Sequence, residues 1–362
     1  MSQVRQHLYM RVYEAANSRL RYFAGGRFAS RCRPTWISFL LTERCNARCC
    51  HCDIWKNRGK EDNPTPDQWK AALSDLRDWL GPVHVCITGG EALLIPSAVE
   101  VIRHGCSIGL HLEILTHGYW QEQSRVEAMA RAKPWRITLS VDGLGEVHSR
   151  VRGREGFHER TFGTIQNLIR MRREEKLGYS ILLKTVIMRH NLDQLSPIAA
   201  YAAENGLEVF YQPIEQNYNT KEDPRWFDSS PNWPTDPDEA VRAVEGLIAL
   251  KRQGFPIENS LTQLEVMIPY FKDPASLRLA TQGHSAHDKH PTCAALSLIQ
   301  VQSNGDVRVC AGAPPVGNIK MGSLRKIWAE RPQWWRGGCC LDTRMTPEER
   351  HPLRGAVPIA PA

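Results

Sequence analysis

The sequence lacks the two features that would take a protein into or across a membrane. No apolar N-terminal core is followed by a small-residue cleavage site, so we expect no signal peptide. No run approaches the roughly 18 consecutive apolar residues that suggest a membrane-spanning helix. We therefore expect a cytoplasmic protein without a transmembrane segment.

The absence of a glycine-rich loop after the first predicted strand argues against one class of enzyme. The apolar run 35–41 predicts a buried strand, but no glycine-rich loop follows it. A methyltransferase that uses S-adenosylmethionine without radical chemistry would need such a loop after its first strand. This chain instead has four cysteines within residues 45–52.

Acidic residues are scarce at the N-terminus, although the chain as a whole has a formal net charge of only +7. Before Pro34 there are seven arginines and a single acid, Glu14. Apolar residues at helical spacing predict an amphipathic helix over 5–23, so we assign residues 1–33 to a basic N-terminal helix. Such a helix could meet an anionic substrate, or it could simply be a solvated face. We expect no nucleic acid partner.

Between residues 34 and 215, predicted strands alternate with predicted helices. Strands are expected at 35–41, 83–88, 110–116, 135–141, 180–188 and 207–213, and helices at 65–80, 96–107, 121–132, 159–176 and 193–204. This alternation favours parallel strands joined by right-handed crossovers. Because six units are too few for a closed eightfold barrel, we predict an α/β fold with a partial (β/α)6 barrel.

The rest of the chain is expected to divide into three parts. Residues 216–290 should form an irregular and helical connection, with helices at 237–252 and 260–272. Residues 291–345 should form a small cluster-binding extension, with a hairpin that turns at Asn304-Gly305 and a helix at 322–330. Residues 346–362 should be a loosely ordered tail.

The cysteines gather in two places. Of the 11 cysteines, four lie within 45–52 and four between 293 and 340, which in a reducing compartment indicates metal or cluster binding rather than disulfides. Cys45, Cys49 and Cys52 form a CxxxCxxC motif after the first predicted strand, and we interpret Cys50 as a bystander. Three thiolates from one loop can bind three irons of a cubane and leave the fourth iron open. Zinc is the alternative, although the spacing does not match a zinc-ribbon pair.

This cysteine loop, the sequence Gly89-Gly90-Glu91 after the second strand and the strand–helix units that follow resemble the radical S-adenosylmethionine (radical SAM) superfamily. The resemblance covers residues 34–215 and implies a [4Fe–4S] cluster on Cys45, Cys49 and Cys52, with S-adenosylmethionine at the open iron. Members of the family cleave S-adenosylmethionine reductively to a 5′-deoxyadenosyl radical, which abstracts a hydrogen atom from the substrate.

The resemblance also assigns residues around the bound S-adenosylmethionine. The expected contacts come from the ends of successive strands and from the cysteine loop: Gly89, Gly90, Glu91, Ser140, Arg152, Gln212 and His51. The last of these replaces the aromatic residue that usually precedes the third cysteine, and His117 replaces the asparagine of a Thr-Asn-Gly sequence. Asp142 and Glu215 are the candidate catalytic residues. Asp142 could instead be a turn residue before Gly143, and Glu215 could instead be a solvated loop acid.

Near the C-terminus, Cys293, Gly305 and Cys310 follow the spacing C-x11-G-x4-C. This resembles the SPASM and twitch domains that bind auxiliary clusters in radical SAM enzymes. The cysteine series of a full SPASM domain is missing, so we predict one auxiliary Fe–S cluster on Cys293, Cys310 and one or both of Cys339 and Cys340. A degenerate domain without a cluster and a zinc site are the alternatives.

The sequence thus predicts a radical SAM oxidoreductase or maturase that abstracts hydrogen from a small molecule or a peptide. It would need an electron donor such as flavodoxin or ferredoxin. The competing interpretation is a non-enzymatic Fe–S or zinc protein that senses redox state and carries a basic arm. Saturable binding of S-adenosylmethionine would distinguish the two.

Overall fold

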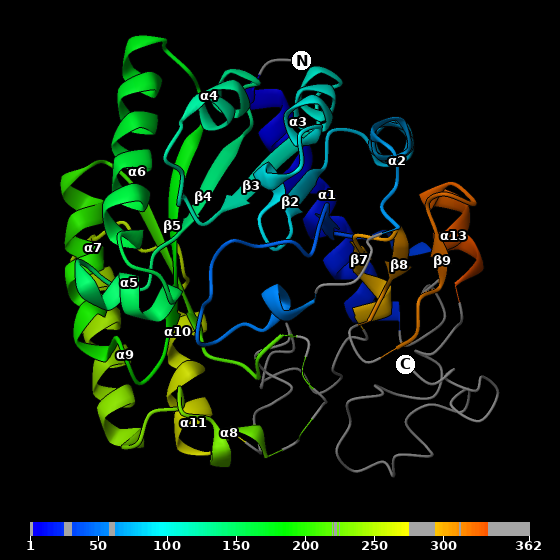
Figure 1. Ribbon diagram of the computed structural model, residues 1–362. Coiled ribbons are helices and arrows are strands. Elements are labelled where there is room, and N and C mark those ends of the chain that lie inside the picture. The colour runs from blue at the N-terminus through cyan, green and yellow to red at the C-terminus, as the bar shows by residue number, and fades with distance from the viewer. Residues whose placement is uncertain are drawn as a thin grey trace.

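Six parallel strands form the centre of the fold, side by side in the order in which they occur in the chain (Figure 1). The computed structural model describes residues 3–24, 31–57, 62–218, 220, 223, 225–274, 294–310 and 313–331. The strands are β1 (Trp36–Leu40), β2 (His84–Thr88), β3 (His111–Thr116), β4 (Arg136–Ser140), β5 (Ser180–Ile187) and β6 (Glu208–Pro213). Each pairs in parallel with the next. The predicted α/β partial barrel is confirmed.

The crossover helices cover the outer face of this curved sheet (Figure 1). They are α2 (Pro66–Leu80), α3 (Ala98–Ser107), α4 (Ser124–Arg131), α6 (Phe157–Glu174) and α7 (Leu195–Glu204). Burial alternates along β2 and β6, as expected from the period-2 geometry of a strand. In β2, for example, Val85 and Ile87 are fully buried in the core, whereas His84 and Cys86 are only half-buried. The second set therefore faces the barrel lumen.

Local sequence explains where the crossover helices begin. Thr65 caps α2 by accepting a hydrogen bond from the backbone of Gln68, whose side chain accepts one from the Thr65 backbone. Pro66 occupies the first helical position, where its missing N–H has no helical partner to lose. This start is the one that the sequence predicts.

The helical structure differs from the prediction in two places. The expected helix 159–176 is α6, and it is preceded by a short helix that was not predicted, α5 (Glu146–Arg152), which ends at Gly153 with φ +69°. The expected helix 260–272 is split at Val266 into α10 (Leu261–Glu265) and α11 (Met267–Lys272). Helix α9 (Pro237–Arg252) lies where it was expected, and α8 (Trp226–Ser229) adds one turn to the irregular connection before it.

The C-terminal hairpin is part of the main sheet. It consists of β7 (Leu298–Val301) and β8 (Asp306–Arg308), and β9 (Gly317–Asn318) follows beside it. The turn includes Gly305 with φ +88°, as predicted for Asn304-Gly305. Unexpectedly, β7 pairs in parallel with β1, so the described sheet has nine strands in the order β6-β5-β4-β3-β2-β1-β7-β8-β9. The extension therefore continues the barrel wall. Helix α13 (Leu324–Glu330) then packs Trp328 against Trp79 of α2.

The predicted N-terminal helix is α1 (Gln3–Ala24), which passes behind β2 and β3 in Figure 1. Three hydrogen bonds fasten it near the N-terminal ends of the strands. The hydroxyl of Tyr9 donates to the carbonyl of Leu80 and that of Tyr13 to the carbonyl of Pro34, both at 2.6 Å. Arg21 donates to the Thr35 hydroxyl at 2.9 Å. Helix α1 thus closes the floor of the barrel, opposite the carboxyl ends of the strands.

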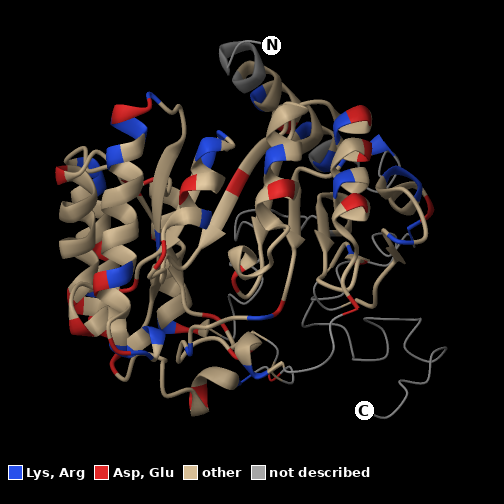
Figure 2. Cartoon of the chain, turned by 45° about the horizontal axis from the view of Figure 1, so that its top comes forward, with Lys and Arg blue, Asp and Glu red and all other residues tan. Residues whose placement is uncertain are grey.

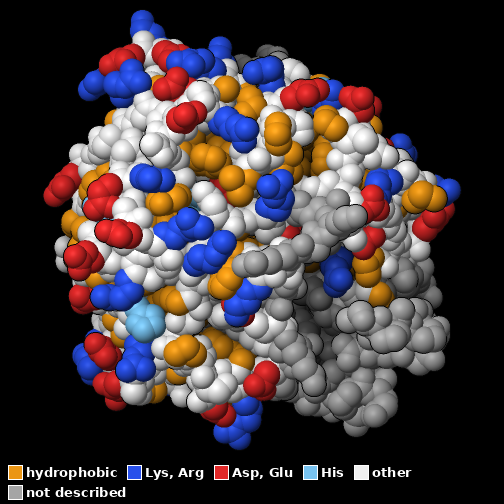
Figure 3. All heavy atoms as spheres, in the orientation of Figure 1, with side chains coloured by type: hydrophobic (Ala, Val, Ile, Leu, Met, Phe, Trp, Pro, Cys, Tyr) orange, Lys and Arg blue, Asp and Glu red, His pale blue; other side chains and the backbone are white. Residues whose placement is uncertain are grey.

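Charged residues lie mostly on the outer helices and connections, and few lie on the strands (Figure 2). On the face seen in Figure 3, basic side chains predominate across the centre, whereas both signs mix towards its edges. Among the described residues, no helix has the length and apolar content needed to cross a bilayer.

Candidate functional site

The cysteine loop lies over the carboxyl ends of the strands, between β1 and a 3₁₀ turn at Ile54–Lys56. Cys49 is buried, and Cys45 and Cys52 are half-buried, all three packed with Ala47 and Phe157. The side chain of Cys50 is exposed. The motif therefore presents three thiols from one short segment at the mouth of the barrel.

The end of α5 holds this loop in place. The backbone N–H of Arg48 donates to the carbonyl of Arg152 at 2.9 Å, and that of Cys50 donates to the carbonyl of Val151 at 3.0 Å. At Gly153 a Cβ atom would overlap the carbonyl oxygen of Arg48. The unpredicted helix α5 is therefore a direct support of the cysteine loop.

Burial disfavours the ionised form of the three thiols. Burial is the main cause that raises the pKa of Cys45 to about 12, and repulsion from the neighbouring Cys49 and Cys52 contributes to this rise. Burial raises the pKa of Cys49 and Cys52 as well. Thiolates are the ligands of Fe–S clusters, and metal binding displaces their protons. Three neighbouring thiols on one loop suit a cluster that is bound by three of its irons.

Arg152 connects the loop to β4. Its Nη2 lies 2.6 Å from Oδ2 of Asp142, and its Nη1 donates to Sγ of Cys49 at 3.6 Å. Burial alone would raise the pKa of Asp142, but the Arg152 charge outweighs it and holds that pKa below its usual value. The backbone N–H of Val186 donates to the other carboxylate oxygen at 2.9 Å. Both predicted site residues thus have partners within the protein.

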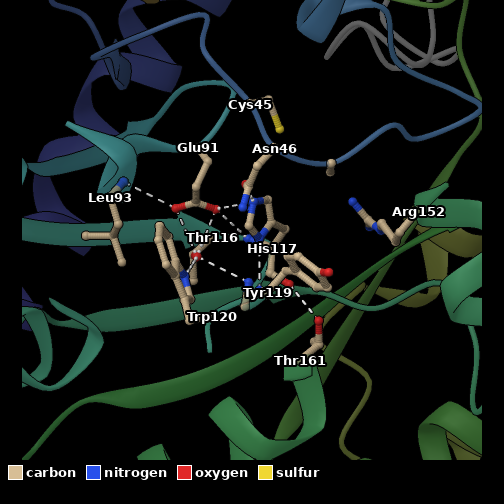
Figure 4. Close-up of polar contacts among 12 residues, drawn as sticks. Cys45, Asn46, Glu91, Leu93, Thr116, His117, Tyr119, Trp120, Arg152 and Thr161 are labelled. Carbon is tan, nitrogen blue, oxygen red and sulfur yellow. Dashed lines mark hydrogen bonds and ion pairs between the residues drawn. The ribbon is translucent and has the colours of Figure 1, made fainter. Parts of the chain in front are cut away.

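Glu91 is also engaged internally. Its carboxylate is 1% exposed and accepts hydrogen bonds from the Thr116 hydroxyl, at 3.0 and 2.9 Å, and from the backbone of His117 at 2.9 Å (Figure 4). Leu93 N–H adds a contact of 3.3 Å. Burial raises the pKa of Glu91 to about 7, against the opposing effect of these donors. The carboxylate that was predicted to meet the ammonium group therefore joins the ends of β2 and β3.

Gly89 and Gly90 allow another segment to approach their backbone closely, and in this structure that segment is the start of the cysteine loop. A Cβ atom on Gly89 would lie 2.7 Å from the carbonyl oxygen of Thr42, and one on Gly90 would lie 2.5 Å from that of Arg44. Backbone hydrogen bonds join the same segments, from Gly90 to Thr42 at 2.7 Å and from Glu91 to Arg44 at 2.8 Å. The glycines thus dock the end of β2 against the loop that carries the thiols.

Sequence reasoning missed Asn46, which links the loop to His117. The backbone N–H of Tyr119 donates to Nδ1 of His117, so the ring proton is on Nε2. The Nε2 atom of His117 lies 2.6 Å from Oδ1 of Asn46 and 3.3 Å from Oε2 of Glu91 (Figure 4). Burial lowers the pKa of His117 to about 3, so the ring is neutral. The only sequence signal for Asn46 is its place beside Cys45.

The remaining predicted residues line the mouth or the lumen. Ser140 is the last residue of β4 and Gln212 the last but one of β6, and both are half-buried. His51 has a buried Nδ1 without a hydrogen bond in the described part of the chain, and burial lowers its pKa to about 4. Solvent reaches the Glu215 side chain, yet the surrounding protein raises its pKa while Lys184 opposes that shift.

Only one of the predicted auxiliary-cluster ligands can be placed. Cys310 follows β8 and is 3% exposed. Cys293, Cys339 and Cys340 lie outside the described residues, as does the tail 346–362.

Comparison with known proteins supports the identification of the cysteine loop. Residues 39–200 match the radical SAM superfamily. The chain is 25% identical over 308 residues to an AdoMet-dependent heme synthase of Methanosarcina barkeri, which covers 82% of each protein. It is 23% identical over 177 residues to the sporulation killing factor maturation protein SkfB of Bacillus subtilis, which covers 49% of this chain and 42% of SkfB. The match thus spans less than half of SkfB.

Among solved structures, SuiB of Streptococcus suis bound to S-adenosylmethionine has the same fold. The TM-score is 0.63, with 16% identity, over 83% of this chain and 66% of SuiB. The CxxxCxxC thiols stand at the carboxyl ends of the parallel strands, as the sequence indicates. The family match over residues 39–200 thus identifies this part of the chain, which carries the cysteine loop, as a radical SAM domain.

Proposed function

We propose that this protein is a radical SAM enzyme that removes a hydrogen atom from a C–H bond of a small molecule or a peptide. The observation that carries the proposal is the set of three thiols, Cys45, Cys49 and Cys52, held at the barrel mouth by β2 and α5. When bound there, a [4Fe–4S] cluster supplies the electron that cleaves S-adenosylmethionine to the 5′-deoxyadenosyl radical.

The residues around the loop divide into two groups in this proposal. Glu91, Asp142 and Arg152 are buried among internal partners, so they position the cysteine loop and the strand ends. Ser140, Gln212 and His51 retain polar atoms towards the mouth or lumen, so they contact S-adenosylmethionine or the substrate. Glu215 is the candidate proton carrier at the mouth, because its raised pKa lets it hold a proton at higher pH than an ordinary glutamate.

Relatives favour biosynthetic or maturation chemistry. The name of SkfB refers to the maturation of a killing factor, and that of PqqA peptide cyclase of Bradyrhizobium diazoefficiens, which is 28% identical over 46% of this chain, refers to the cyclisation of a peptide. The heme synthase is similar over nearly the whole chain, and its name refers to a small-molecule product. We extend both substrate classes to this protein and place its activity in the cytoplasm, with flavodoxin or ferredoxin as the electron donor.

We further propose one auxiliary Fe–S cluster on Cys293, Cys310 and one or both of Cys339 and Cys340. The support is the burial of Cys310 directly after a strand that continues the barrel wall. A cluster there could accept an electron from the substrate, and the net reaction would then be an oxidation.

The enzymatic proposal can be tested with anaerobically purified protein that is reconstituted with iron and sulfide. We expect 5′-deoxyadenosine after dithionite and S-adenosylmethionine are added. Cys49→Ala should abolish it, whereas Cys106→Ala, which changes a thiol on the outer helix α3, should not. No product from fully loaded wild-type protein would overturn the proposal.

The auxiliary cluster requires a separate measurement. In Cys49→Ala, iron should fall but remain measurable, and Cys310→Ala should remove that remainder. If Cys49→Ala alone lost all its iron, the second cluster would be excluded. Mössbauer spectra would distinguish iron clusters from adventitious iron.

A further inference from the structure

A cavity of about 760 Å³ lies between α1 and the barrel, below the cysteine loop. Helix α1 lines it with Arg11, Glu14 and Arg21, and the strands line it with side chains that face the lumen, including Cys86, Glu113 and Lys184. A volume of this size is typical of small-ligand sites. Since α1 lines one side of this cavity and the strands line the other, we refer to it as the chamber.

Most of the polar groups from the strands already have partners. His84 lies 3.1 Å from the carboxylate of Glu113, and the hydroxyl of Thr138 donates to the same carboxylate at 2.6 Å. Although burial opposes it, this environment holds the pKa of Glu113 below its usual value, so Glu113 is ionised and paired. These groups therefore offer little free charge to a ligand.

Lys184 is different. Its ammonium group has no hydrogen bond or ion pair with any residue in the described part of the chain, although the residue is half-buried in the barrel wall. Burying an ammonium without a counter-ion is costly, so a site that keeps one is prepared for an anion. Across the chamber, three permanent cations, Arg11, Arg21 and Lys184, face the two carboxylates Glu14 and Glu113.

Lys184 also lies between the chamber and the cysteine side of the barrel. It is paired in register with Ser140, at the end of β4. Burial and Glu113 raise the pKa of Cys86, and Lys184 opposes them from within the chamber. At the mouth, the surrounding protein raises the pKa of Glu215, and Lys184 opposes that shift too. The same ammonium thus acts on groups at both ends of the lumen.

We propose that Lys184 binds a carboxylate group of the substrate in the chamber that α1 closes. This assignment rests on the proposed function, because it gives the substrate of that reaction an anionic group. A single unpaired ammonium beside the fixed negative charge of Glu113 matches a monoanion better than a phosphate dianion. The carboxylate belongs either to a small molecule or to a side chain of a peptide.

Cys86 provides a probe of this chamber that does not depend on turnover. Iodoacetate and iodoacetamide have nearly the same size and differ in charge, and both alkylate thiols. Holoprotein would be treated anaerobically with each reagent at mildly alkaline pH, and labelling of Cys86 would be measured by peptide mass spectrometry. Cys106, a half-buried thiol on α3, serves as the internal reference.

We expect the ratio of iodoacetate to iodoacetamide labelling to be about 1.4 to 5 times higher at Cys86 than at Cys106, the range expected of a partly solvated charge pair. Lys184→Met should bring the two ratios together. Lys184→Arg should preserve the difference, and so should Lys326→Met, which removes an exposed ammonium from α13. Equal ratios in the wild type, or a ratio at Cys86 that Lys184→Met leaves unchanged, would overturn the proposal.

A second experiment identifies the source of the carboxylate by measuring whether added ligands protect Cys86 from alkylation by iodoacetamide. The probes are glutarate with its diamide, and a short alanine peptide with one central glutamate, paired with its glutamine version. Protection by glutarate alone supports a small molecule, and protection by the glutamate peptide alone or by both supports a peptide side chain. If the neutral partners protect equally well, Lys184 is not the binding group. Since no step uses S-adenosylmethionine, failure here is distinct from failure to form 5′-deoxyadenosine.

Discussion

Arg152 donates a hydrogen bond to the sulfur of Cys49, 103 residues away in the chain, while its other terminal nitrogen is paired with Asp142. The Arg152 residue is 6% exposed, so its charge is weakly screened. Hydrogen bonds and charges near cysteine ligands are among the features that set the potential of a cluster. The Arg152–Asp142 pair therefore connects the sequence after β4 to the electron chemistry of the loop.

We predict that Arg152→Met lowers the midpoint potential of the cluster on the cysteine loop, because a positive charge and a hydrogen bond to Cys49 are both lost. Asp142→Asn should raise it, because Arg152 then acts without its counter-ion. An EPR-monitored redox titration of each reconstituted variant measures both shifts. Arg150→Met, an exposed change on the same helix, is the control and should leave the potential unchanged. Shifts of the same sign in the first two variants would contradict this role.

The sequence predicts the barrel well because its strands and helices carry strong local periodicity. The run 83–88 alternates buried and lumen-facing residues, and Thr65-Pro66 marks a helix start in the sequence itself. The pairing of β7 with β1 could not be predicted in this way. This pairing joins segments about 260 residues apart, and the local sequence of a hairpin does not predict to which edge of a sheet its strands will add.

In the candidate site, too, the sequence predicts some residues and does not predict others. The thiols and Gly89-Gly90-Glu91 are contiguous motifs, so the sequence identifies them. Their partners are not contiguous. Helix α5 is short and highly charged, and its role depends on where Gly153 places its end. The engagement of Glu91 by Thr116 depends on the register of β2 and β3, which fixes what each strand end meets.

We predict that Gly153→Ala destabilises the cysteine loop and lowers cluster occupancy. The residue combines a φ of +69° with a backbone oxygen where its Cβ would lie, so it adds a steric clash to a conformational cost of about 1–3 kcal/mol. Iron content per chain after gel filtration measures the effect.

Substitutions at two other glycines distinguish the steric from the conformational cause of the reduced cluster occupancy. Gly206 has φ +62° with nothing within 4 Å of its Cβ position, so Gly206→Ala isolates the conformational cost. Gly163 lies in α6 with open space around it, and Gly163→Ala should be neutral or stabilising by about 1 kcal/mol. Iron loss in Gly206→Ala as large as in Gly153→Ala would mean that contact with the loop is not the cause.

We predict that His117→Ala loosens the loop from the side of Cys45. It leaves the amide oxygen of Asn46 and one oxygen of Glu91 without their ring donor, which costs about 1–3 kcal/mol for buried groups. Cluster release to an iron chelator should therefore be faster than in the wild type. His117→Gln, which can place an amide donor near Asn46, should recover part of the difference. Equal release rates in the wild type and His117→Ala would argue that the ring only fills space.

The raised pKa of Glu91 predicts a specific pH dependence of stability. In the unfolded chain its pKa is 4.5, and burial raises it to about 7 in the folded protein. Between these values the folded state binds the proton more tightly, so protonation stabilises the fold. That contribution is fully present below pH 4.5 and is lost as pH rises through about 7. The shift corresponds to about 3 kcal/mol.

Urea unfolding of the anaerobic holoprotein at pH 5.5 and at pH 8 can isolate this contribution, since the two values lie on either side of the folded pKa of about 7. Other groups also titrate in this range, so the informative quantity is the difference between the wild type and Glu91→Gln. The amide cannot ionise but still accepts one of the two backbone hydrogen bonds from His117 and Leu93. We expect Glu91→Gln to lose less stability than the wild type between the two pH values. If both lose the same amount, Glu91 is ionised throughout, and the donors around it outweigh its burial.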